Sequence, residues 1–224
     1  AINVPTVPGP DLTPVVALLE AGREAGWHDG AQCYVSMRGE PLLDVAVGQS
    51  VPGRDLRTDD VMLWYSSGKP FTTVAVLQLW EQGRLGLDDR VAEYVDGWGG
   101  GKETATIRHL LTHTGGFPMF GADPFDRDVT FAEAVAAVAA APAAWVPGTA
   151  AGYHPASSWR ILGAIVERVD GRPIRQYLHD EVVTRLGLAD TSLGIPLEEQ
   201  ERLGDRIVRV AWTGHTMPKV DPDG

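Results

Sequence analysis

The sequence predicts a mixed α/β (α+β) fold, in which an N-terminal helix and a short antiparallel sheet precede a long helical region. Three observations support this prediction. Apolar residues recur at helical spacing after Pro14, alternate with polar residues over residues 31–48, and return to helical spacing from residue 67 to about 190. The chain of 224 residues, 44% of them apolar and 22% charged, is long enough for one large or two small globular domains.

The first 66 residues are expected to form one helix and one hairpin. Thr13 is the predicted N-cap of a helix over residues 14–26, with Pro14 as its first residue. Residues 31–48 are the predicted hairpin, with its turn around Gly39. An isolated hairpin is too little sheet to be stable. We therefore expect it to lie on the helical region, or to receive further strands from a segment not present in this chain.

The region after residue 66 is expected to be mainly helical. Residues 67–82 are apolar on nearly every side, which predicts a buried helix. Start and stop signals predict further helices over residues 106–112, 130–141, 155–171 and 173–187, the second of them opened by a capping box of Thr130 and Glu133. Beyond about residue 190 the pattern weakens, and only residues 207–212 suggest a strand.

Charge and composition exclude several classes of function. Lys and Arg number 19 and Asp and Glu number 30, so the net charge of −11 repels phosphate backbones and predicts no nucleic-acid partner. No apolar run approaches the roughly 20 residues of a membrane span, so we expect no membrane insertion. Cys33 is the only cysteine, which excludes an internal disulfide and a multi-cysteine zinc site. No secretion signal is visible at the N-terminus, which favours the cytoplasm, although a signal already removed would leave the same sequence.

Ser66 and Lys69 are the first candidates for catalysis. A helix that begins near Ser67 places them on one face, about one turn apart. The amine and the positive end of the helix both favour an ionised oxygen, which would make the serine a nucleophile. Pro70 suits the first turn, where backbone N–H groups have no partner within the helix. The alternative is a chance S-x-x-K pattern at a helix cap, because such four-residue patterns are common.

Tyr153 is the second candidate, at the entrance to the helix predicted from Pro155. There a phenol can point into a cleft, and a neighbouring ammonium would lower its pKa and make it a usable base. For a single tyrosine, a half-buried place at a helix cap is the simpler interpretation. His154 beside it is equally consistent with a place in the cleft and with a capping or exposed role.

A metal site is the main competing interpretation. His109 and His113 are four residues apart and can share one helix face, but no acidic partner is near them, which favours a structural role and predicts no metal. The motifs G-x-S-x-G, H-E-x-x-H and the phosphate-binding P-loop are absent from the sequence. The acidic residues at 198, 199 and 201 are interpreted as a solvated charged face.

Five landmarks then follow one another in a recognisable order. They are the S-x-x-K segment 64–71, LGLDDRV at 85–91, IRHLLTHTGG at 107–116, PGT at 147–149 with Tyr153, and LGAIVE at 162–167. Over residues 30 to 190 the chain resembles the serine β-lactamase and penicillin-binding-protein superfamily. It is most similar to the branch of class C β-lactamase-like esterases.

The resemblance implies a β-lactamase-like fold, with an antiparallel sheet flanked by terminal helices and an inserted helical region. Residues 1–66 would form the N-terminal part of the sheet domain, 67–200 the helical region, and 201–224 the uncertain start of a return to the sheet. Ser66 would be the acylated nucleophile, and Lys69 and Tyr153 would share the work of the general base. The Ser66 N–H would be one arm of the oxyanion hole. No cofactor is implied.

The activity implied is that of a carboxylesterase-like serine hydrolase, which cleaves a small ester, or an amide, through an acyl-serine. The partner would be a small-molecule acyl substrate in a cleft lined by Tyr65, His154 and Phe120. The alternatives are an acyltransferase that uses the same acyl-enzyme, a D-amino-acid peptidase, a weak β-lactamase, and a non-catalytic binding protein with this fold.

Two departures from the family pattern matter. Class C β-lactamases have an asparagine two residues after the tyrosine, where this chain has Pro155, and Asn3 is its only asparagine. This counts against efficient β-lactamase activity and suits an esterase. The third motif, on a later strand that supplies the other oxyanion N–H, has no convincing match at residues 98–100 or 213–215. We therefore expect that a companion polypeptide, or a C-terminal segment absent from this chain, completes the sheet and the oxyanion hole.

Overall fold

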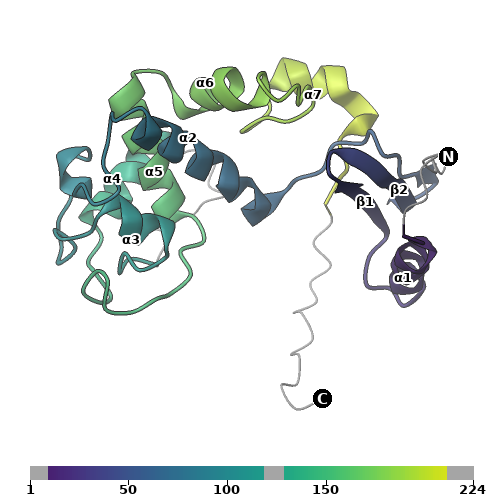
Figure 1. Ribbon diagram of the computed structural model, residues 1–224, viewed down its shortest axis with the longest axis horizontal. Coiled ribbons are helices and arrows are strands. Elements are labelled where there is room, and N and C mark those ends of the chain that lie inside the picture. The colour runs from purple at the N-terminus through teal and green to yellow at the C-terminus, as the bar shows by residue number, and fades with distance from the viewer. Residues whose placement is uncertain (1–9, 119–128, 211–224) are drawn as a thin grey trace, which may run out of the picture. The chain divides into compact units, whose positions relative to one another are not determined.

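The computed structural model describes residues 10–118 and 129–210 (Figure 1). The chain divides into two compact units, one of residues 1–63 with 196–224 and the other of residues 64–195. The predicted helical region, 67–200, has almost the same limits as the second unit. In the part of the chain that is described, no helix combines the length and the hydropathy needed to cross a bilayer.

The first unit contains a three-stranded antiparallel sheet in the order β1-β2-β3. Its strands are β1 (Gly30–Met37), β2 (Glu40–Val51) and the short β3 (Arg54–Asp55). The predicted hairpin is confirmed, with Cys33 opposite Val45 and an irregularity in register after Val35. Leu43, Val45 and Val47 are buried because alternate residues of β2 face the same side of the sheet.

Helix α1 (Thr13–Glu24) packs against β2. The prediction that Thr13 is its N-cap is wrong by one residue, because Leu12 occupies that position and makes no side-chain cap. The Asp11 carboxylate instead accepts a hydrogen bond of 2.9 Å from the Thr13 N–H. A carboxylate in this position satisfies one of the backbone donors at the helix start, which the threonine hydroxyl was expected to do.

The chain returns to the first unit through α7 (Leu197–Leu203) and the 3₁₀ turn η4 (Gly204–Arg206). Val61 and Ile207 then form an isolated parallel bridge, in which the Val208 N–H donates to the Val61 carbonyl at 2.9 Å. The predicted strand over residues 207–212 is therefore present as this bridge, and its last two residues lie outside the described residues.

The second unit is helical, as predicted. Its elements are the 3₁₀ turn η1 (Tyr65–Gly68), α2 (Lys69–Glu81), the 3₁₀ turn η2 (Val91–Glu93), α3 (Ile107–Leu111), α4 (Phe131–Ala140), α5 (Ser157–Asp170), α6 (Ile174–Leu178) and η3 (His179–Val183). The predicted capping box opens α4, where the Thr130 side chain accepts from the Glu133 N–H and the Glu133 carboxylate accepts from the Thr130 N–H. Helices α2 and α5 lie against each other, and residues such as Val76, Leu79 and Ile161 are fully buried between them.

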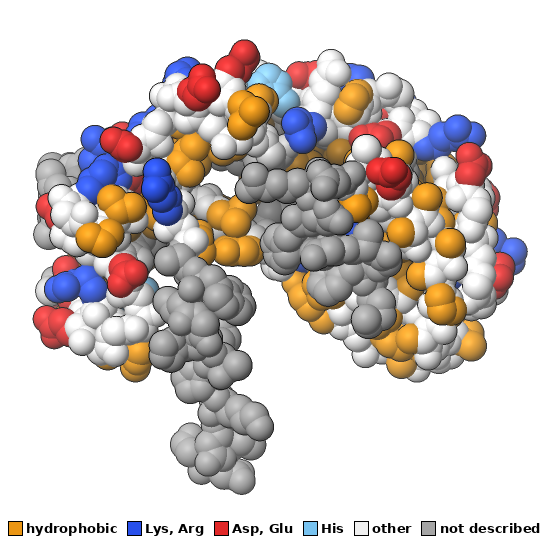
Figure 2. Space-filling model, turned by 180° about the vertical axis from the view of Figure 1, so that it is seen from behind, with side chains coloured by type: hydrophobic (Ala, Val, Ile, Leu, Met, Phe, Trp, Pro, Cys, Tyr) orange, Lys and Arg blue, Asp and Glu red, His pale blue; other side chains and the backbone are white. Residues whose placement is uncertain are grey.

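Helix α2 departs from its predicted burial. Thr72, Ala75, Val76 and Leu79 are buried, but Val74, Leu77 and Trp80 on another side remain exposed. The reason is that α5 and α6 cover only part of its circumference. Figure 2 shows hydrophobic side chains on the surface of this unit as well.

The predicted helix over residues 173–187 is not one regular α-helix. It runs as α6 to Leu178 and continues as the π-helical turn η3, in which the Thr184 N–H donates to the His179 carbonyl five residues earlier. π-Helical turns and α-helical turns follow similar apolar patterns, so the sequence does not distinguish them.

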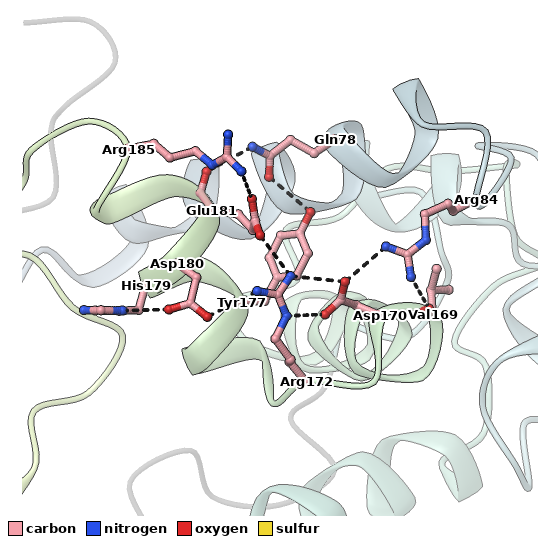
Figure 3. A network of polar contacts seen from close by, with 10 residues as sticks. All are labelled: Gln78, Arg84, Val169, Asp170, Arg172, Tyr177, His179, Asp180, Glu181 and Arg185. Atoms are coloured by element: carbon pink, nitrogen blue, oxygen red, sulfur yellow. Dashed lines mark hydrogen bonds and ion pairs between the residues drawn. The ribbon is translucent and has the colours of Figure 1, made fainter.

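A network of ion pairs around Arg172 ties the ends of these helices together (Figure 3). The Arg172 guanidinium contacts Asp170 at the end of α5 at 2.6 Å, Asp180 at 3.2 Å and Glu181 at 3.1 Å. Arg84, in the turn after α2, pairs with the same Asp170 carboxylate at 3.1 Å. The C-terminal end of α2 is thereby fixed against the C-terminal end of α5.

Candidate active site

Ser66 lies in η1, the tight turn that leads directly into α2. The residue before it, Tyr65, has φ 46°, a left-handed conformation that is uncommon for a residue other than glycine. Pro70 occupies the first turn of α2, where it blocks no intrahelical hydrogen bond. The local sequence therefore places Ser66 at the positive end of the helix, close to where helical periodicity predicts it.

Three side chains named from the sequence converge at this point. The Lys69 Nζ donates a hydrogen bond of 2.9 Å to the Ser66 Oγ. The Tyr153 hydroxyl, from the segment that precedes α5, donates to the same oxygen at 2.7 Å. Ser66 is exposed, Lys69 is partly exposed, and Tyr153 is 54% exposed. One hydroxyl is thus in direct contact with two groups that can take up or deliver its proton.

The electrostatics of the cluster favour an ionised phenol. Its hydrogen bond to Ser66, and then the hydrogen bond and positive charge of Lys69, lower the pKa of Tyr153 from its ordinary value. The Lys69 Nζ lies 5.2 Å from the centre of the Tyr153 ring and 5.3 Å from that of Trp159. Two aromatic rings therefore flank the ammonium group of Lys69.

Trp159 is a site residue that the sequence analysis missed. Its indole N–H donates a hydrogen bond of 2.9 Å to the Lys69 carbonyl, which links the first turn of α5 to the first turn of α2. The available signal was its position six residues after Tyr153, on the same segment of chain as the candidate base.

The expectation that His154 lines the cleft is wrong, because its side chain is fully buried. Its Nε2 accepts a hydrogen bond of 3.1 Å from the Phe117 N–H, and its ring packs edge-on against the Phe117 ring. Burial lowers the pKa of His154. Tyr65, by contrast, is 60% exposed and lines a cavity, while Phe120 lies outside the described residues.

The cavity lies beside the cluster and has a volume of about 700 Å³. Its walls include Tyr65 and Lys69 from the start of α2 and Trp159 from α5, together with Phe131, Ile174 and Leu193. The aromatic and aliphatic side chains would desolvate an apolar group of a ligand favourably, while Arg160, Glu167 and Arg175 add charged groups to the lining. Lys69 belongs both to this wall and to the cluster around Ser66.

His109 and His113 are not arranged as metal ligands. The His109 Nδ1 accepts from the Thr106 N–H at 3.2 Å and closes the start of α3, while the His113 Nδ1 accepts from the His154 N–H at 3.0 Å. Across residues 10–118 and 129–210, no three His, Cys, Asp or Glu side chains are grouped so that they could hold a metal ion.

Comparison with known proteins agrees with this fold. The sequence matches the beta-lactamase family over residues 15–223. Esterase EstB of Burkholderia gladioli is 32% identical over 194 residues, which cover 77% of this chain and 48% of that esterase. A penicillin-binding protein homologue from Caulobacter crescentus gives a TM-score of 0.77 at 27% identity, covering 92% of this chain and 56% of that one. The structure of a family VIII carboxylesterase gives a TM-score of 0.76 at 26% identity, and the match covers 90% of this chain and 56% of that one.

The chain therefore belongs to the beta-lactamase family. The predicted resemblance and the predicted β-lactamase-like fold are both confirmed. The chain spans about half the length of these relatives.

Proposed function

We propose that the protein is a serine hydrolase that cleaves a small carboxylic ester through an acyl-serine. The observation that supports this best is the contact of the Ser66 Oγ with both the Lys69 Nζ and the Tyr153 hydroxyl. This is the arrangement of a nucleophile with adjacent general bases. The similarity to an esterase and to a carboxylesterase structure favours an ester as the substrate.

The reaction proceeds in two steps. In the first, the Ser66 Oγ bonds to the ester carbonyl carbon while its proton passes to the base formed by Tyr153 and Lys69. The carbonyl oxygen takes the negative charge, with the Ser66 N–H as one stabilising donor. Breaking of the ester C–O bond then releases the alcohol, which receives the proton from the same base.

In the second step, deacylation, a water molecule attacks the acyl group and releases Ser66. The base removes a proton from a water molecule, whose oxygen bonds to the acyl carbon, and the bond from that carbon to the Ser66 Oγ breaks. The proton returns to Ser66, and the carboxylic acid leaves. Tyr153 and Lys69 thus deliver and take up one proton in each half-reaction.

We propose that an apolar part of the ester occupies the cavity of about 700 Å³ beside Lys69, against the aromatic and aliphatic part of its lining. Pro155, which also lines this cavity, stands where β-lactamases of class C have an amide side chain. Pro155 has no side-chain hydrogen-bond donor, so the site is suited to an ester rather than to a substrate that must be held by its amide.

We also propose that a further polypeptide segment completes the sheet and supplies the second oxyanion donor. Within the described residues, β1 is an edge strand that is paired only with β2, and Tyr34 and Met37 on it are exposed. A free edge with exposed apolar side chains is a surface on which another strand can pair.

Intact mass spectrometry after treatment with a fluorophosphonate tests the proposal. We expect one adduct per chain, located at Ser66 by peptide digestion and absent from Ser66→Ala. Ser67→Ala is the matched control, because Ser67 is also exposed and lies in the same turn. An adduct that persists in Ser66→Ala would contradict the proposal. The same spectra report a companion polypeptide, and product analysis with added methanol separates hydrolysis from acyl transfer.

A further inference from the structure

His113 occupies a position where a glycine would be easier to accommodate. It directly follows α3 and its C-cap Thr112, and its φ is 59°. The Thr114 N–H donates to the His109 carbonyl and the His113 N–H donates to the Leu110 carbonyl, which is the Schellman pattern of helix termination. Glycine is usual at this place because a side chain in the left-handed region costs about 1 kcal/mol.

The side chain and the backbone of His113 both contact the segment around Tyr153. The His113 carbonyl accepts a hydrogen bond of 3.0 Å from the Gly152 N–H, and the Nδ1 accepts one of 3.0 Å from the His154 N–H. The two backbone amides on either side of Tyr153 are thus held by one residue. Of these two bonds, only the second depends on the identity of the side chain.

The imidazole ring also packs against the catalytic cluster. Its centre lies 4.8 Å from the centre of the Tyr153 ring and 4.9 Å from that of Trp159. Trp159 in turn donates to the Lys69 carbonyl. His113 therefore contacts the segments that hold both candidate bases, and within the described residues no hydrogen bond joins it to Ser66.

We propose that His113 is a positioning residue, which holds the Tyr153 phenol in register with the Ser66 Oγ by anchoring the backbone on both sides of Tyr153. The proposal rests on the proposed function, because it assigns His113 to the same proton transfer. Catalytic groups must be held to within about half an ångström, so loss of the anchor lowers the rate of the chemical step.

The protonation of His113 is consistent with this role. Its Nδ1 accepts a hydrogen bond, so the ring must be unprotonated at that atom. Burial, and then the positive charge of Lys69, lower the pKa of His113. Among the described residues, the other titratable groups whose rings contact His113 are Tyr153 and His154.

His109 provides a matched comparison within the same helix. It also uses its Nδ1 to accept from a backbone N–H, that of Thr106, but this bond closes the start of α3. A histidine with a purely structural role is expected to behave like His109. If His113 positions Tyr153, its substitution is expected to lower kcat, whereas substitution of His109 is not.

Three variants separate these roles in an assay with a p-nitrophenyl ester. His113→Gly removes the Nδ1 acceptor and the ring, while a glycine adopts the left-handed backbone without strain. His113→Asn supplies an amide oxygen near the former Nδ1 and tolerates φ above zero. His109→Asn is the control. We expect His113→Gly to lose roughly 10- to 100-fold in kcat with KM within about threefold, His113→Asn to recover most of it, and His109→Asn to keep the wild-type kcat.

A second measurement does not depend on turnover. With ¹³Cζ-tyrosine labelling, the Tyr153 resonance, assigned with Tyr153→Phe, is titrated in each variant by NMR. We expect the pKa of Tyr153 to rise toward its ordinary value in His113→Gly, because the phenol moves away from Ser66 and then also from Lys69, and to stay low in His113→Asn. An unchanged pKa together with wild-type kcat in His113→Gly would overturn the inference. An inactive wild type with no adduct at Ser66 would instead overturn the proposed function, and the titration would still decide the role of His113.

Discussion

The Tyr153 hydroxyl lies 2.7 Å from the Ser66 Oγ, although 87 residues separate the two in the sequence. The serine oxygen also accepts from the Lys69 Nζ, so it is the meeting point of a phenol and an amine. Nucleophilic attack requires that one of these two groups be ready to receive the serine proton. The pH dependence of the reaction and the effects of removing each group follow from this relationship.

Tyr153→Phe tests the contribution of the phenol. The variant keeps the ring but loses the hydroxyl, and we expect kcat to fall by roughly 10²- to 10⁴-fold, the usual contribution of a general base. Because the pKa of Tyr153 is lowered, the kcat/KM of the wild type should rise with pH through an apparent pKa below 10. This rise of kcat/KM with pH should be absent from Tyr153→Phe. A variant with full activity and the same profile would assign the base to another group.

Lys69→Ala is expected to be comparably severe, because the amine is both a partner of Ser66 and the charge that helps to lower the pKa of Tyr153. When catalytic residues act as a unit, removing one of them lowers the rate nearly as much as removing several. The double variant Lys69→Ala with Tyr153→Phe should therefore lose little beyond either single variant. Steady-state kinetics of the three proteins measure this, and fully multiplicative losses would show that the two groups act independently.

Elements governed by local patterns could be predicted from the sequence. The hairpin follows from alternation, and the start of α4 follows from the spacing of Thr130 and Glu133. Ser66 and Lys69 could be paired because they are three residues apart at a helix start. Tyr153 is different, because its place beside Ser66 depends on tertiary packing, and only the family resemblance connected the two.

The features that the sequence did not predict correctly also have physical causes. His154 was expected beside Tyr153 in the cleft, but neighbouring residues of a non-helical segment point in different directions, so Tyr153 is exposed and His154 is buried. The exposure of Trp80 depends on which elements cover α2, and composition does not specify that. The left-handed conformation of His113 was hidden because glycine, not histidine, normally marks such a helix end.

Trp159→Phe tests the link between α5 and the Lys69 carbonyl. The phenyl ring keeps most of the contact with Lys69, but the indole N–H is lost. A single neutral hydrogen bond contributes about 1 kcal/mol, and the loss of that amount from the transition state is expected to lower kcat roughly fivefold. Trp80→Phe is the control, because Trp80 is exposed on α2, away from the described contacts of Lys69. Equal losses in the two variants would contradict a specific role for Trp159.

Arg172→Met tests whether the ion-pair network stabilises the helical unit. The variant leaves the Asp170 carboxylate, which is largely buried, with Arg84 as its remaining arginine partner among the described residues. We expect unfolding to require about 2 kcal/mol less near pH 7, measured by urea denaturation. Arg168→Met is the control, because Arg168 is exposed in the last turn of α5 and has no ion pair in the described structure. Its free energy of unfolding should stay within about 0.5 kcal/mol of the wild type.

The same pair of variants should respond differently to acid. The hydrogen bond with Arg172, and then that with Arg84, lower the pKa of Asp170 in the folded protein. A carboxylate with a lowered pKa contributes stability above the pKa of the unfolded chain, near 4, and this contribution is lost as the pH falls through the folded value. The difference between the wild type and Arg172→Met should therefore be largest near neutral pH and shrink progressively below about pH 4. A difference that stays constant down to pH 3 would mean that Arg172 stabilises the unit by packing on the Tyr177 ring, 5.0 Å away, rather than by its charge.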